Sequence, residues 1–208
     1  DTVWAAFFSG SAVRSTDFGQ TWERVLPGGG EQIVYNNGAF LARVDSLVEA
    51  DATADAVARA RAEADSVRAL AFLHRTFSVA AYGDTVWIGT SYGVASSFDF
   101  GRTWSIHKSR VNDFGEPLPD NLSGDWGLAI EREIRPDGGS VVWVGANVTE
   151  GPGQQPAINR TVDDGLTWTF TGPTFAWDLV FTGSDTVWAG TDDGLLLRMS
   201  EQSWDKVL

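Results

Sequence analysis

The chain has 208 residues, enough for one domain with a sizeable core, and 43% of them are hydrophobic, too many for a disordered protein. Because 28 Asp and Glu face only 15 Lys and Arg, the net charge of −13 argues against nucleic-acid binding. With no Cys and only two His, the sequence implies no disulfide, metal or cofactor, and no apolar run reaches the about 18 residues of a membrane span.

The first predicted element is a strand beginning at Val3, because β-branched and aromatic residues cluster there. Its tetrapeptide, Asp-Thr-Val-Trp, recurs at 84–87 and 185–188, and in the form Ser-Val-Val-Trp at 140–143. The chain opens with Asp directly at this strand, so we expect a processed chain or a piece of a longer one.

A second motif, Ser/Thr-x-Asp-x-Gly-x-Thr-Trp, follows three of these strands, and a worn fourth copy ends at Trp204. The Asp can accept backbone N–H bonds and the Gly tolerates positive φ, which together predict a tight turn before a Trp that begins the next strand. We expect these motif residues to be structural: Ser15, Asp17, Gly19, Trp22, Ser97, Asp99, Gly101, Trp104, Thr161, Asp163, Gly165 and Trp168.

Residues 27 to 75 do not fit this repeat. Asn36-Asn37-Gly38 lies between two short apolar runs, 33–35 and 39–41, a pattern typical of a β-hairpin. From about 46 to 75 the chain is rich in Ala, lacks Gly and Pro, and has i,i+4 charge pairs, which predicts one helix. Such an insertion can cover the edge of a sheet or dock a partner, and both alternatives stay open.

Further apolar segments at 77–82, 126–130 and 175–181 precede the last three Val-Trp strands, so each repeat contains four short antiparallel strands. Units of this kind are propeller blades. The sequence therefore predicts an all-β propeller with one α-helical insertion, part of a larger ring. Residues 1–45 form a first blade without its inner strand plus a hairpin, 46–75 the insertion, and 76–208 three further blades.

The octapeptide motif resembles the Asp-box (BNR) repeat of sialidase-like and sortilin-like propellers, of xyloglucan-cleaving glycosidases and of a photosystem II assembly factor. The resemblance implies a propeller in which the Asp box is a peripheral turn, distant from the central ligand site. Sialidase catalytic residues are not matched, since Ile134-Arg135-Pro136 reverses the expected order of that family's signature.

The candidate ligand residues lie where the chain enters the innermost strands, near the expected axis. Asp125 and Trp126 form one pair and Trp177 and Asp178 the other. A Trp beside a carboxylate suits a sugar, and two carboxylates about 5–9.5 Å apart could act as acid and base in glycoside hydrolysis. Alternatively, both Trp side chains fill the core and both Asp side chains cap loops.

These observations favour a non-catalytic propeller that acts as a scaffold or accessory subunit for protein partners. The resemblance to secreted bacterial propellers, together with 13 Arg against two Lys, suggests a bacterial protein of the periplasm or cell exterior. The likeness to an assembly factor suggests a membrane-associated complex as the partner. The alternative is a glycan-active hydrolase or carbohydrate-binding propeller that uses Asp125, Asp178, Trp126 and Trp177.

Overall fold

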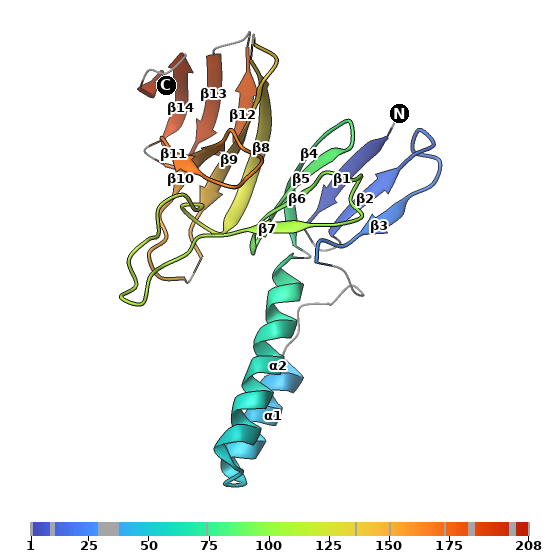
Figure 1. The fold of residues 1–208 in the computed structure, drawn as a ribbon, viewed down its shortest axis with the longest axis vertical. Helices are drawn as coiled ribbons and strands as arrows, with labels where there is room; N and C mark the ends of the chain where they lie inside the picture. Colours follow the sequence, from blue (N-terminus) through green and yellow to red (C-terminus); the bar gives the residue numbers. More distant parts are fainter. Residues whose placement is uncertain are drawn as a thin grey trace.

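The computed structural model describes residues 2–8, 11–28, 38–73, 75–135, 137–149, 151–172, 174–182, 186–199 and 203–207. Four antiparallel sheets and a helical insertion make up this part of the chain (Figure 1). The fold is therefore the propeller-like all-β fold with a helical insertion that the repeat predicts.

The first sheet has three strands in sequential order, and the other three sheets have four strands each. The strands of the first sheet are β1 (Val3–Phe7), β2 (Ser11–Ser15) and β3 (Glu23–Val25). The second sheet contains β4 (Thr76–Tyr82), β5 (Thr85–Thr90), β6 (Gly93–Ser97) and β7 (Ser105–His107). The third contains β8 (Trp126–Ile134), β9 (Ser140–Asn147), β10 (Ala157–Thr161) and β11 (Thr169–Phe170), and the fourth β12 (Asp178–Phe181), β13 (Thr186–Thr191), β14 (Gly194–Met199) and β15 (Asp205–Lys206).

The apolar core lies between successive sheets, because β5 and β9, two of the strands that carry the Val-Trp motif, are buried on both faces. Trp87 of β5 packs in one cluster with Ile130 and Val142 of the third sheet. Trp143 of β9 packs in the next cluster with Leu179 of the fourth sheet. Stacking of sheets face to face leaves both faces dry, which explains why these strands are apolar at consecutive positions.

Glycine allows the sheets to approach closely near their inner strands. A Cβ atom on Gly89 of β5 would lie 2.0 Å from the carbonyl oxygen of Gly127 in β8. One on Gly145 of β9 would lie 2.4 Å from the carbonyl oxygen of Ala176, just before β12. Backbone of one sheet therefore rests directly on backbone of the next, and no side chain fits between them.

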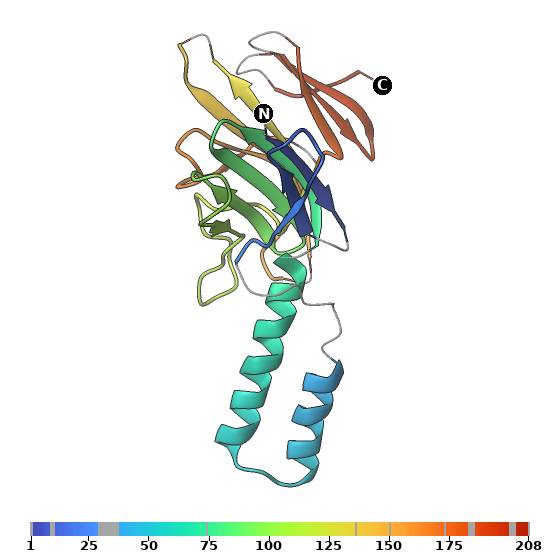
Figure 2. The same ribbon diagram turned by 90° about the vertical axis from the view of Figure 1, so that its right-hand side faces the viewer.

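The insertion is a pair of helices, α1 (Gly38–Glu49) and α2 (Ala54–Leu73), that run side by side and stand away from the sheets (Figure 2). Small residues form the contact between the helices: Ala60 and Ala64 are buried, with Val44 of α1. Thr53 caps α2, since its carbonyl oxygen accepts the N–H groups of Ala56 and Val57.

The predictions of a hairpin and of a single helix from about 46 to 75 are wrong, since this segment contains two helices. The helical part begins at Gly38, not near residue 46, and residues 39–41 are the first turn of α1 rather than a strand. Ala and Leu are strong helix formers, and no further alternation follows to hold a hairpin. Residues 33–37 lie outside the described part of the chain. The helices do not cover the edge of a sheet, because they project from the sheets (Figure 1).

Candidate functional site

Three turns at one end of the sheets repeat the same hydrogen bonds. In the first, Gly19 N–H donates to the Ser15 hydroxyl oxygen (2.7 Å), and that hydroxyl donates to the Asp17 carboxylate (2.8 Å). The backbone N–H and hydroxyl of Thr21 also donate to Asp17, at 2.8 and 2.6 Å. Equivalent bonds form in the other two turns, around Asp99 and Asp163.

These bonds stabilise the ionised form of the aspartates. The Thr21 hydroxyl, with the Thr21 N–H, lowers the pKa of Asp17 to about 2, and the Thr103 N–H and hydroxyl lower the pKa of Asp99 to about 2. For Asp163 burial acts in the opposite direction, but the bonds from Thr167 and Thr161 together keep its pKa below the ordinary value. Each carboxylate is engaged within its own turn.

The opposite end of the sheets carries the hairpin formed by helices α1 and α2, and it is called the hairpin face below. Strand pairing places the end of β1, the start of β4, the start of β8 and the start of β12 at this end. The long connection 108–125 and the loop 148–156 also belong to it, because they join strands there. Trp126 and Trp177 therefore lie on the hairpin face and the three repeated turns do not.

Phe8, Phe77 and Trp126 form a row on the hairpin face, called the aromatic row below, in which Phe8 and Trp126 are exposed. The rings of Phe8 and Phe77 lie 5.6 Å apart, and those of Phe77 and Trp126 lie 5.9 Å apart. Phe8 is 60% exposed and Trp126 38%. Trp177 is 55% exposed and packs edge-on against Phe175. Neither Trp126 nor Trp177 is therefore a core residue. Phe8 and Phe77, which extend the aromatic surface beside Trp126, were not predicted as site residues from the sequence.

Asp125 is 6% exposed and is held by neighbouring groups on every side. One carboxylate oxygen accepts bonds from the N–H and hydroxyl of Ser109, at 2.8 and 2.9 Å. The other accepts from the Gln154 amide (3.0 Å) and lies 3.6 Å from the Lys108 ammonium. This network joins the connection 108–125 to the loop 148–156 and leaves Asp125 no free oxygen.

A different carboxylate, that of Glu131, is affected by the charge of Asp178. Glu131 lies in the middle of β8 and is partly buried, which raises the pKa of its carboxyl group, and the negative charge of Asp178 raises it further. Asp178 itself is exposed at the start of β12. The charge of Asp178 therefore acts on Glu131, whereas the sequence pointed to Asp125 and Asp178 as the pair.

Within the described ranges, no cluster of three or more His, Cys, Asp or Glu side chains could hold a metal ion. Likewise, neither described helix is both long and apolar enough to span a membrane.

No family model and no curated protein matches this sequence. Among solved structures, the chain is similar to an ancestral GH74 enzyme, a β-propeller glycoside hydrolase, with a TM-score of 0.56 at 13% identity. The match covers 99% of this chain and 22% of that chain, so this chain spans about a fifth of the length of its structural relative. The likeness places the chain in the class of propeller-like all-β folds.

Proposed function

We propose that the chain is an Asp-box β-propeller segment that acts as a non-catalytic scaffold for a protein partner. The observation that supports this most is the hairpin face, from which the two helices project (Figures 1 and 2). The same end carries the neighbouring rings of Phe8, Phe77 and Trp126, of which Phe8 and Trp126 are exposed. Exposed apolar patches mark interaction surfaces, and aromatic residues often dominate their binding energy.

The Asp-box assignment is supported by the repeated hydrogen bonds of the three turns. Their Asp side chains fix the backbone at the end away from the helices, and this makes the sheets a rigid base for the hairpin face. We further propose an exported protein of the bacterial periplasm or cell exterior, from the resemblance to secreted propellers. The resemblance to an assembly factor suggests that the partner belongs to a membrane-associated complex.

The base of the helices and the aromatic row would be contacted together. Phe77 is the second residue of β4, and α2 ends at Leu73 only a few residues before it. A partner lying on Phe8, Phe77 and Trp126 would therefore also reach α2. The rings supply apolar contact area at low entropic cost, and the helices extend the contact beyond the propeller.

The test is affinity capture from the envelope fraction of the source organism with the full chain as bait. We expect partners to be lost when residues 29–74 are replaced by a Gly-Ser linker and strongly reduced by Trp126→Ala. Phe18→Ala is the control, because Phe18 is also an exposed aromatic residue but lies in a repeated turn at the other end. Partners that survive both changes on the hairpin face would contradict the scaffold proposal.

A glycan-active propeller is the second candidate, favoured by the exposed Trp177 beside Asp178 and by the likeness to the GH74 fold. Its acid and base would be Glu131 and Asp178, with Asp125 holding the loops in place. Purified protein is screened on a panel of polysaccharides alongside Asp178→Asn, Glu131→Gln and Asp125→Asn. Turnover by the parent that is lost in Asp178→Asn would show a hydrolase and contradict the scaffold proposal. If the parent binds a glycan without cleaving it, and Trp177→Ala abolishes this binding, the result would indicate a lectin-like role.

A further inference from the structure

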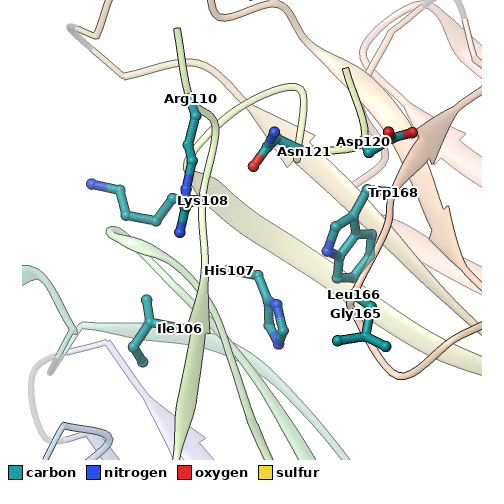
Figure 3. Close-up of a pocket in the computed structure, with 9 residues that line it drawn as sticks. All are labelled: Ile106, His107, Lys108, Arg110, Asp120, Asn121, Gly165, Leu166 and Trp168. Atoms are coloured by element: carbon teal, nitrogen blue, oxygen red, sulfur yellow. The ribbon is translucent and has the colours of Figure 1, made fainter. Parts of the chain in front are cut away.

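A small pocket lies between β7 and the third repeated turn, outside the aromatic row (Figure 3). Its volume is about 140 Å³. A water molecule needs roughly 10–15 Å³ on this measure, so the pocket can hold a ligand of several non-hydrogen atoms. The walls come from β7 of the second sheet, the connection 108–125 and the third repeated turn.

The Trp168 indole differs from its two counterparts in the other turns. The indole N–H of Trp22 donates to the Gly19 carbonyl oxygen and that of Trp104 donates to the Gly101 carbonyl oxygen, both at 3.1 Å. Trp168 is 4% exposed, yet its N–H has no hydrogen-bond acceptor in the described part of the chain. A buried donor without an acceptor is costly, so a group that supplies one would be stabilised here.

His107 explains why the third turn differs. It occupies the position that Val25 occupies in the first sheet, three residues after the preceding motif Trp. Its ring stacks on Trp87, its Nε2 bonds to the Ser96 hydroxyl at 2.8 Å, and the Gly165 backbone forms a hydrogen bond with it. His107 therefore lies against the Gly165 backbone, whose counterparts in the other two turns accept the indole N–H. The edge contact between the His107 and Trp168 rings offers only a weak alternative to the indole N–H.

The other polar groups around the pocket determine which acceptor fits. The Arg110 side chain is exposed and extends along the wall opposite Trp168, whereas the Asp120 carboxylate points away from the space between them (Figure 3). Lys108 is engaged elsewhere, with Asp125 and with the Tyr92 ring at 3.3 Å. A guanidinium and an N–H that face one space suit an anionic oxygen acceptor, and the exposed Leu166 side chain beside the pocket is available to an apolar group attached to that acceptor.

We propose that this pocket binds a carboxylate attached to a short apolar group, with the Trp168 N–H and the Arg110 guanidinium as donors. Such a group can come from a free small acid or from the C-terminus of a peptide. None of the residues of the aromatic row lines this pocket, so the site does not depend on the proposed scaffold function.

The experiment follows the Trp168 indole N–H signal by ¹⁵N NMR, assigned with Trp168→Phe, while isobutyrate is added to the full chain. We expect a saturable shift that isobutyramide does not produce. Arg110→Gln should weaken binding about tenfold, because it removes one charge-assisted bond. Arg102→Gln is the control, since Arg102 is an exposed Arg of the second turn, away from this pocket, and should leave the affinity unchanged.

A second titration uses a short peptide ending in Leu, with a free or an amidated C-terminus. If the free peptide shifts the Trp168 signal and isobutyrate does so less or not at all, the result would support the carboxylate site and assign it to a protein ligand. The proposal would be overturned if neither isobutyrate nor the free peptide shifts the Trp168 signal. It would also be overturned if isobutyramide and the amidated peptide give equal shifts, or if Arg110→Gln leaves the shifts unchanged. The Arg110→Gln variant retains Trp168, so its signal also reports whether the pocket is still folded.

Discussion

At the scale of single residues, the aspartates of the repeated turns link the fold to pH. The pKa of Asp99 is about 2 in the folded chain, against an ordinary value of 3.8. Between these values the unfolded chain binds the extra proton, so the free energy of unfolding falls as the pH drops through this window. We expect Asp99→Asn to lower the free energy of unfolding at neutral pH. Between pH about 4 and about 2 this variant should lose less of its free energy of unfolding than the parent does, because the side chain no longer binds a proton.

Urea unfolding curves of the parent and Asp99→Asn across this pH range test the effect. Asp113→Asn is the control, because it removes the same charge from an exposed position in the connection 108–125. If the two variants show the same pH dependence, the turn hydrogen bonds do not govern acid stability.

Gly165 is a second residue whose role can be isolated. Its φ is +87°, and a Cβ atom there would lie 2.4 Å from Cε1 of His107. Gly138 has a similar φ of +84° but nothing within 4 Å of the equivalent point. We expect Gly138→Ala to cost about 1 kcal/mol from backbone strain alone and Gly165→Ala about 2–4 kcal/mol, because the clash is added. Chemical denaturation of both variants measures the difference, and equal losses would refute a tight contact with His107.

These residues also show where sequence reasoning succeeds at this scale. The turn role of Asp17 was predictable because its partners, Ser15 and Thr21, are only a few positions away. Glu131 and His107 were not singled out as site residues, since their surroundings come from the next sheet. Asp125 was predicted beside the ligand, yet its actual partners, Ser109 and Gln154, are 16 and 29 residues distant in sequence.

At the scale of elements, the Val-Trp strands are where the sheets meet, and their glycines set the distance. Gly89, Gly145 and Gly190 occupy the same position in β5, β9 and β13. Only the first two face a following sheet, since nothing described lies within 4 Å of a Cβ on Gly190. We expect Gly89→Ala to destabilise the 208-residue chain by about 3 kcal/mol, because a methyl group cannot fit against the Gly127 carbonyl.

Gly190→Ala provides the matched comparison and should change stability by less than about 1 kcal/mol. Thermal unfolding of both variants, followed by Trp fluorescence, measures the two effects. Equal destabilisation would mean that the position matters for the strand itself rather than for the contact between sheets.

The elements differ in how well their sequences specified them. The inner strands β4, β8 and β12 were predicted from apolar runs. Only β8 has several consecutive buried residues, whereas β4 and β12 are mostly half-buried or exposed. The helices were specified less well. An Asn-Gly pair suggested a hairpin, but the residues after it continue as Ala-Phe-Leu-Ala-Arg-Val, and this run supports α1. Local turn signals were overridden by the helix propensity of a longer segment.

At the scale of the whole molecule, repeats made the architecture predictable and left the chemistry open. Recurring Trp residues specify a stack of similar sheets, since each sheet must bury its apolar faces against the next. The position of the helices relative to the aromatic row follows from chain connectivity alone: α2 leads into β4, whose start lies at that end. Which ligand these groups meet depends on exposed side chains, and no internal repeat constrains those.

The free-standing helices lead to the last prediction, that they contribute little to the stability of the sheets. The bond between Arg43 and Glu63 is exposed and joins the helices only to each other, so it contributes at most about 1 kcal/mol. None of the ten Trp residues lies between 29 and 74, so helix and sheet signals separate cleanly. Replacing residues 29–74 with a Gly-Ser linker should remove most helical circular dichroism, keep the near-UV Trp spectrum and shift the midpoint of thermal unfolding by only a few degrees. Loss of the Trp spectrum in this variant would show that the helices support the sheets, and loss of partner binding could then no longer be assigned to the hairpin face.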